Sequence, residues 1–252
     1  MTYKLMAIDI DGTLLNDEQK ITPKNIQMIQ AAMHKGTKIV LCTGRDYQGA
    51  ISNANRLGLK GSDEYMIYFG GSRIQNFDGK VIYQKTLAET DAIELINFFT
   101  VHKIRFDLID SEGVHSTSYQ TWAKRSAKNP DLKIIKFLLT TNEEDLAETA
   151  ALLHVNYDQS YFTVQTSATE LELFPKGINK GTALTYLANY LQIDLADVVA
   201  VGDMDNDIPM LKRVGLSVAM GNAIIAVKKI CDIETADNNH SGVAKVISDY
   251  VL

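Results

Sequence analysis

Cysteine, clustered positive charge and long apolar runs are all scarce in this sequence of 252 residues. Its two cysteines, Cys42 and Cys231, form no CxxC pair, and Cys42 lies within an apolar run, so we expect free, buried thiols. No apolar run approaches the roughly 20 residues that span a bilayer. The first ten residues hold only a short apolar stretch that Asp9 interrupts, unlike a signal peptide. These absences predict a cytoplasmic protein without a membrane partner.

The sequence contains fewer basic than acidic residues. The sequence has 25 Lys and Arg residues against 31 Asp and Glu residues, a formal net charge of -6. No basic run offsets this surplus, so we expect no nucleic-acid partner. A phosphorylated small molecule would also be repelled at long range. Any phosphate site in this chain therefore needs a local cation, either a side chain or a metal ion.

The first 70 residues alternate between predicted strands and helices. Residues 4–8 and 38–42 are predicted to be buried strands, and Thr22-Pro23 supplies the N-cap and first-turn proline of a helix between them. A helix over residues 46–57 and a strand over residues 65–69 complete a βαβαβ unit. Such a unit opens a doubly wound parallel sheet. Asp78-Gly79 then predicts an antiparallel hairpin.

A mixed pattern follows the hairpin and lasts until about Gly177. It predicts an α+β insert with its own antiparallel sheet, made of helices over residues 88–102 and 143–154 and strands over residues 105–109, 134–139, 161–166 and 170–174. The parallel rhythm then returns, with helices over residues 181–191 and 207–213 and strands over residues 198–201 and 216–220. We therefore predict an α/β protein with a doubly wound, mostly parallel, Rossmann-like core over residues 1–84 and 177–252, and an inserted α+β domain over residues 85–176.

Polar residues follow the predicted parallel strands, at the end of the sheet where doubly wound proteins bind ligands. Asp9 and Asp11 follow the first strand, Thr43-Gly44 follows the second, and Asp203 follows the fourth. Three carboxylates from two strand ends would repel one another unless a cation lies between them. Mg²⁺ prefers such oxygen ligands and leaves positions for water and a substrate phosphate. The sequence therefore predicts a Mg²⁺ site at Asp9, Asp11 and Asp203.

A phosphate group at that site would need further donors and a second positive charge. The Thr43 hydroxyl, the Gly44 backbone N–H and the Lys180 ammonium group can supply them. Asp9 can then attack phosphorus, because the metal and Lys180 neutralise its charge. Asp11, two residues further on, can give a proton to the leaving oxygen and later take one from water.

Four segments in this order resemble the motifs of the haloacid dehalogenase superfamily: DIDGTLL at Asp9 to Leu15, TGR at Thr43 to Arg45, Lys180, and GDMDNDIPML at Gly202 to Leu211. The insert after the third strand, and Gly242-Val243-Ala244 before a last helix, are similar to the Cof-type sugar-phosphatase branch with a type IIB cap. The resemblance covers essentially the whole chain, and the motifs are specific in combination.

The resemblance implies a role for each matching residue. Asp9 would be the nucleophile and a magnesium ligand, Asp11 the acid/base residue whose backbone carbonyl also binds the metal, and Asp203 the last protein ligand. Phosphate contacts would come from the Ile10 backbone, Thr43, Gly44, Lys180 and Asn206, and Asp207 would support the metal ligands. One segment departs from the branch, which usually carries Asn-Gly-Ala where this chain has Gly70-Gly71-Ser72. A side-chain contact is lost there, so we expect a different leaving-group preference.

Each of these features also has a simpler interpretation. Asp-Gly after a strand usually marks a turn, and Lys180 could be a solvated lysine. The GDMDND segment resembles the start of an EF-hand loop, but Ile208 and Val214 stand where that loop needs Gly and Glu. Arg45 suits a helix start or an ion pair. Trp122 and the tyrosines of the insert could line a substrate site, although packing is the commoner role of such residues.

The combined motifs favour a phosphomonoester hydrolase that acts on small phosphorylated metabolites through an aspartyl-phosphate on Asp9. Sugar phosphates are favoured as substrates by the resemblance only. A phosphomutase or phosphotransferase with the same intermediate is the first alternative. The second is a module that senses a phosphorylated metabolite with little turnover. Nothing in the sequence indicates whether the chain forms oligomers.

Overall fold

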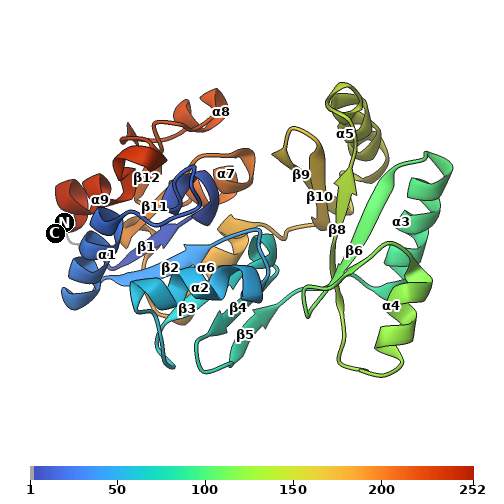
Figure 1. The fold of residues 1–252 in the computed structure, drawn as a ribbon, viewed down its shortest axis with the longest axis horizontal. Coiled ribbons are helices and arrows are strands. Elements are labelled where there is room, and N and C mark those ends of the chain that lie inside the picture. Colours follow the sequence, from blue (N-terminus) through green and yellow to red (C-terminus); the bar gives the residue numbers. More distant parts are fainter. Residues whose placement is uncertain (1–2) are drawn as a thin grey trace. The chain divides into compact units, whose positions relative to one another are not determined.

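The computed structural model describes residues 3–252 and divides them into two compact units, drawn as a ribbon in Figure 1. Unit 1 comprises the chain up to Gln84 together with Asn179–Leu252, and unit 2 is Lys85–Ile178. The first two residues of the predicted core lie outside the described residues. Unit 1 contains a mostly parallel sheet and unit 2 a separate antiparallel sheet, which confirms the predicted α/β class.

The sheet of unit 1 has eight strands in the order β13-β12-β11-β1-β2-β3-β4-β5. The six strands from β13 to β3 are parallel, and β4 and β5 add an antiparallel hairpin at one edge. The strands β1 and β11 are wholly buried, and β2 is buried beyond its first residue, Lys38, because their residues are apolar on both faces, as in other parallel sheets. The bounds are β1 Leu5–Ile8, β2 Lys38–Cys42, β3 Tyr65–Tyr68, β4 Arg73–Asn76, β5 Val81–Gln84, β11 Val198–Gly202, β12 Leu216–Ala219 and β13 Ile233–Glu234.

Helices connect these strands in two groups. From β1 the chain runs through α1 (Pro23–His34) and α2 (Tyr47–Leu57) toward β3, whereas α6 (Lys180–Tyr190) and α7 (Ile208–Leu211) lead it toward the opposite edge. Right-handed crossovers therefore place the two groups on opposite faces, and the strand order reverses between β1 and β11 (Figure 1). The helix starts follow the sequence, since the Thr22 and Asp46 side chains cap α1 and α2.

Shorter elements complete unit 1. The helices α8 (Ile225–Lys228) and α9 (Gly242–Val246) follow β12 and β13. Six single turns lie at strand ends and near the C-terminus: η1 Ile10–Leu14, η2 Phe69–Gly71, η3 Leu195–Asp197, η4 Asp205–Asp207, η5 Asn238–His240 and η6 Ile247–Val251. The predicted helix over residues 207–213 is thus a 3-10 turn followed by one turn of α-helix. The last helix begins at Gly242 itself rather than after the Gly-Val-Ala segment.

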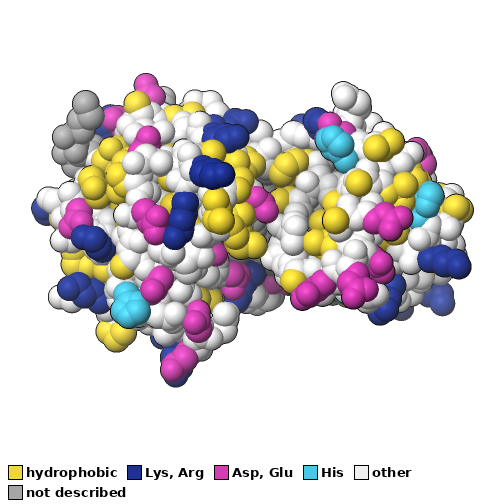
Figure 2. Space-filling view, turned by 90° about the horizontal axis from the view of Figure 1, so that it is seen from above, with side chains coloured by type: hydrophobic (Ala, Val, Ile, Leu, Met, Phe, Trp, Pro, Cys, Tyr) yellow, Lys and Arg dark blue, Asp and Glu magenta, His cyan; other side chains and the backbone are white. Residues whose placement is uncertain are grey.

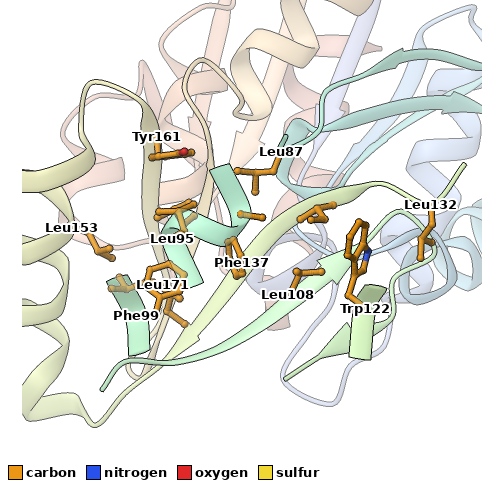
Figure 3. Close-up of a cluster of buried hydrophobic side chains, with 14 of the residues drawn as sticks. Leu87, Leu95, Phe99, Leu108, Trp122, Leu132, Phe137, Leu153, Tyr161 and Leu171 are labelled. Carbon is orange, nitrogen blue, oxygen red and sulfur yellow. The ribbon is translucent and has the colours of Figure 1, made fainter. Parts of the chain in front are cut away.

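Unit 2 is a five-stranded antiparallel sheet, in the order β7-β6-β8-β10-β9, with three helices. Its aromatic core is shown in Figure 3, where Phe99, Phe137 and Trp122 point into one cluster with leucines from the helices and strands. Trp122 therefore packs in the core, as the simpler interpretation expected. The bounds are α3 Glu89–Val101, β6 Arg105–Asp110, β7 His115–Ser116, α4 Tyr119–Ser126, β8 Ile134–Thr140, α5 Glu143–Tyr157, β9 Tyr161–Ser167 and β10 Glu170–Pro175.

The surface mixes charges of both signs. On the face that Figure 2 shows, both Lys or Arg and Asp or Glu side chains occur over each unit. Within residues 3–252, every helix is too short or too polar to cross a bilayer.

Candidate active site

Three neighbouring strands of unit 1 bring the predicted site residues together. β1 lies between β11 and β2, and all three strands run parallel. Asp9 follows the last residue of β1, Thr43 follows that of β2, and Asp203 follows that of β11. All three residues therefore lie at the carboxyl edge of the sheet, close to the point between β1 and β11 where the strand order reverses.

Asp9, Asp203 and Asp207 form a compact acidic group at this edge. One carboxylate oxygen from each lies within 4.8 Å of the others, and the three residues are only 4%, 5% and 0% exposed. Burial, together with repulsion by Asp207, raises the pKa of Asp9 well above its usual value. The same two causes raise the pKa of Asp203 from 3.8 to about 7. Ionisation of both Asp9 and Asp203 is thus unfavourable unless a further cation lies beside them.

Lys180 is the cation that the chain itself supplies to this group. It is the first residue of α6 and is 1% exposed, and its Nζ donates to Asp9 Oδ1 at 2.5 Å and to Asp207 Oδ1 at 2.6 Å. Burial alone would lower the pKa of Lys180, but the charges of Asp207 and Asp9 outweigh it and raise the pKa above the usual value. Lys180 is therefore a charged partner of the site, and the solvated-lysine interpretation is wrong.

The acidic group suits a divalent cation by charge and by ligand type. Lys180 offsets one of its three formal negative charges, and the remaining two equal the charge of one Mg²⁺ ion. Its donor atoms are carboxylate oxygens, the ligands that Mg²⁺ prefers. Compared with the predicted ligand set, the carboxylate of Asp207 lies in this group, whereas that of Asp11 does not.

Asp207 also shapes the loop that carries Asp203. Its Oδ2 accepts hydrogen bonds from the backbone N–H groups of Asp203 at 2.9 Å and of Met204 at 3.1 Å. The loop therefore folds around the Asp207 carboxylate, which orients Asp203 and receives Lys180 at the same time. This geometry fits the supporting position that the resemblance implies for Asp207.

The turn after β1 brings the chain close to Asp203. Gly12 has φ +72°, and a Cβ atom there would lie 2.3 Å from Asp203 Oδ2. The next residue, Thr13, donates its hydroxyl to Asp203 Oδ1 at 2.9 Å. Asn222 fixes the turn from the other side, because its Nδ2 donates to the Gly12 carbonyl at 2.8 Å. Glycine is thus required at position 12 both by the backbone conformation and by the space available.

Asp11 lies outside the acidic group and pairs with Arg45. Arg45 donates from Nε to Asp11 Oδ2 at 2.8 Å and from Nη2 to Asp11 Oδ1 at 2.5 Å. The ion-pair interpretation of Arg45 is thereby confirmed. The Asp11 side chain is 51% exposed, in contrast to the buried carboxylates beside it.

The predicted phosphate-binding residues other than Lys180 lie in the segments that follow β1, β2 and β11. Ile10 is buried in the turn after β1, and Thr43 is fully buried with its backbone N–H bonded to the Ile67 carbonyl at 3.0 Å. Gly44 follows directly. Asn206 is half-buried in the 3-10 turn Asp205–Asp207. The Gly70 N–H donates to the Thr43 carbonyl at 2.9 Å, so the Gly70-Gly71-Ser72 segment, which departs from the family pattern, lies next to Thr43.

The two cysteines do not belong to the acidic group. Cys42 and Cys231 are free, and Cys42 is buried as expected, whereas Cys231 is only half-buried. Burial raises the pKa of the Cys42 thiol, which keeps it neutral and unreactive. Among residues 3–252, the one group of carboxylate, thiol or imidazole side chains close enough to hold a metal is the acidic group of Asp9, Asp203 and Asp207.

The sequence profile of the haloacid dehalogenase-like hydrolases matches residues 6–247 of the chain. The chain belongs to this family. Among its relatives, the 5-amino-6-(5-phospho-D-ribitylamino)uracil phosphatase YcsE of Bacillus subtilis is 34% identical over 253 residues, covering 99% of this chain and 96% of its own. A haloacid dehalogenase-like hydrolase of Bacteroides thetaiotaomicron has the same fold, with a TM-score of 0.81 at 27% identity over 98% of this chain and 99% of its own.

The comparisons confirm the predicted superfamily, its Cof branch and its enzyme class, a hydrolase of the phosphatase type. The subclass IIB sugar phosphatase BT4131 matches in fold, with a TM-score of 0.77 at 21% identity over 97% of this chain and 98% of its own. Within this haloacid dehalogenase-like site, sequence reasoning missed two contacts. The Thr13 bond to Asp203 could have been sought because Thr13 belongs to the first motif. The Asn222 bond to Gly12 spans 210 positions and has no local signal.

Proposed function

We propose that this haloacid dehalogenase-like protein is a Mg²⁺-dependent phosphomonoester hydrolase that forms a phosphoryl intermediate on Asp9. One observation carries the proposal: a buried acidic group, paired with a buried lysine, lies at the carboxyl ends of β1 and β11. Burying such charges costs several kcal/mol unless they are compensated, so the arrangement needs a functional explanation. A metal and phosphate site provides one.

In the first step, the Asp9 carboxylate attacks phosphorus and the bond between phosphorus and the ester oxygen breaks. The leaving oxygen takes a proton from the Asp11 carboxyl group. Lys180, in contact with Asp9, reduces the repulsion between the carboxylate and the phosphate. Asp9, Asp203 and the Asp11 backbone carbonyl would hold Mg²⁺, which supplies further positive charge next to the phosphate oxygens.

In the second step, water attacks phosphorus, and the bond between phosphorus and the Asp9 oxygen breaks. The Asp11 carboxylate takes the proton of the attacking water, which restores both residues for the next cycle. The Ile10 and Gly44 backbone N–H groups, the Thr43 hydroxyl and the Asn206 amide would donate to the phosphate oxygens in both steps. These donors are polar groups of the turns that follow β1, β2 and β11.

Small phosphorylated metabolites are the proposed substrates, with sugar and sugar-alcohol phosphates first among them. The relative YcsE is named as a phosphatase of 5-amino-6-(5-phospho-D-ribitylamino)uracil, in which a ribityl chain, a sugar alcohol, carries the phosphate. We further propose that unit 2 serves as a cap that excludes bulk water and selects the leaving group. Gly70 would then favour leaving groups different from those of relatives with Asn at this position.

Phosphate release from a panel of sugar phosphates, sugar-alcohol phosphates and nucleotides tests the proposal. We expect turnover with Mg²⁺, loss of turnover with EDTA, and none in Asp9→Asn, while Asp78→Asn, an exposed turn residue, should match the wild type. Turnover in Asp9→Asn would exclude Asp9 as the nucleophile. Transfer of the phosphoryl group to a sugar hydroxyl would favour a phosphotransferase, and binding without hydrolysis would favour a sensing module.

A further inference from the structure

The Arg45 guanidinium group joins three segments of unit 1. It binds both oxygens of Asp11 through Nε and Nη2, at 2.8 Å and 2.5 Å. Its Nη2 also donates to Gln19 Oε1 at 2.9 Å, and its Nη1 donates to the Gly49 carbonyl at 3.2 Å. The bidentate pairing fixes the plane of the Asp11 carboxylate as well as its position, because the guanidinium fork is rigid and planar.

The backbone of Arg45 is itself fixed next to the phosphate cradle. Its N–H donates to the Thr43 hydroxyl oxygen at 3.1 Å, and its carbonyl accepts from the Phe69 N–H at 2.9 Å. Arg45 therefore extends from a rigid point, two residues from Thr43, to the carboxylate of Asp11. These two backbone hydrogen bonds restrict the position from which the Arg45 side chain extends.

Asp11 depends on such a partner more than the other carboxylates of the site do. Asp9, Asp203 and Asp207 are nearly fully buried, so their surroundings restrict their side chains. The Asp11 side chain is 51% exposed and would otherwise sample several rotamers. A half-exposed ion pair of this kind restrains a side chain by about three- to fivefold in population, which orders Asp11 without locking it.

We propose that Arg45 is a positioning residue that acts through Asp11, by holding its carboxylate in the orientation needed for proton transfer to the leaving oxygen. The inference rests on the proposed function, in which Asp11 is the acid/base residue. Arg45 contributes no reacting atom. Its effect should therefore appear only in substrates that need a proton on the leaving oxygen, and only while Asp11 is present.

A purely structural role at the start of α2 is the competing explanation. That helix has its own cap, since the Asp46 side chain accepts from the Gly49 N–H at 2.6 Å. The Arg45 contact with Gly49 is therefore not needed to begin the helix. A structural role would also reduce activity toward every substrate alike, which gives the two explanations different kinetic signatures.

The test compares kcat/KM for an alkyl phosphate, whose leaving oxygen needs a proton, with that for 4-nitrophenyl phosphate, whose leaving group does not. Because kcat/KM reports the steps up to phosphoryl transfer to Asp9, it isolates the acid role of Asp11. We expect Arg45→Gln to lower kcat/KM about three- to fivefold for the alkyl ester and less than about twofold for the aryl ester. Arg45→Lys, which keeps the charge but loses the fork, should fall between Arg45→Gln and the wild type.

Two further variants complete the design. In an Asp11→Asn background, Arg45→Gln should cause less than about a twofold further loss, because the two residues act as one unit. Arg56→Gln changes an exposed arginine of α2, the helix that follows Arg45, and should behave as the wild type. Equal losses on both esters, or the same loss in the Asp11→Asn background, would overturn the inference.

Crystal structures of the wild type and Arg45→Gln provide a readout independent of turnover. We expect one Asp11 rotamer in the wild type and several in the variant, and a single unchanged rotamer in both would overturn the inference. A wild type inactive toward every ester would contradict the proposed function, and with it the catalytic part of this inference. An active wild type without the predicted coupling would contradict the role of Arg45 alone.

Discussion

Asp203→Asn is expected to stabilise the metal-free protein at about pH 8, although it removes a proposed metal ligand. In the folded chain, burial and the charge of Asp207 raise the pKa of Asp203 from 3.8 to about 7. The asparagine side chain keeps the shape of aspartate and can still accept the Thr13 hydroxyl. The substitution therefore removes a disfavoured charge and leaves the packing in place.

The magnitude follows from the pKa of Asp203. The difference between 3.8 and about 7 corresponds to about 4 kcal/mol of preference for the protonated form. The folded state binds this proton more tightly than the unfolded chain does, so the free energy of unfolding falls as the pH rises from about 4 to about 7. Asp203→Asn lacks this titration. Relative to the wild type it should gain about 2–4 kcal/mol above pH 7, and the gain should vanish toward pH 4.

Urea denaturation in EDTA and in excess Mg²⁺ measures both effects. The wild type should gain about 2.7 kcal/mol at a free Mg²⁺ concentration of 100 times its Kd, and Asp203→Asn much less, so that the order of stability changes with the metal. Asp78→Asn serves as the control for a charge removed from an exposed turn. A variant less stable than the wild type in EDTA at about pH 8, or a gain independent of pH, would refute the reasoning.

Two further predictions concern the packing around the site and within unit 2. Gly12→Ala should lower Mg²⁺ affinity and turnover together, because its Cβ would lie 2.3 Å from Asp203 Oδ2; unchanged metal affinity in a calorimetric titration would contradict this. Phe137→Ala should lower the free energy of unfolding by about 3–5 kcal/mol, and Phe137→Leu by less, because the ring is fully buried and packs on Phe99 and Phe106. A loss below about 1 kcal/mol in chemical denaturation would show that the unit 2 core collapses around the missing ring.

Much of the fold could be predicted because its elements have strong local signals. The strand β2 is a continuous apolar run, α1 has a threonine cap with a following proline, and the β4–β5 hairpin has an Asp-Gly turn. The position of the site followed from one general rule, that the carboxyl ends of parallel strands share an edge. Asp9, Thr43 and Asp203 lie there because β1, β2 and β11 are neighbours in the sheet.

The elements that were missed are short or polar. In α4, only Trp122 is buried, so the helix lacks an apolar stripe, and the strands β7 and β13 have two residues each. Side-chain partners could not be predicted either. The pairing of Asp11 with Arg45, and of Asp207 with Lys180, depends on which carboxylate turns inward, and that is decided by packing between segments distant in sequence.

The pairing of β1 with β11 has a consequence for biosynthesis. β1 pairs with β2 along one edge and with β11 along the other, where Leu5 pairs with Val198. The edge that faces β11 therefore has no partner until most of the chain has been made. At about 5–20 residues per second, the ribosome needs roughly 10–40 s to cover that distance. During this time the nascent chain carries an exposed apolar strand edge, the feature on which other chains aggregate. Unit 2 is encoded between β1 and β11, so its synthesis lengthens the time for which this strand edge stays unpaired.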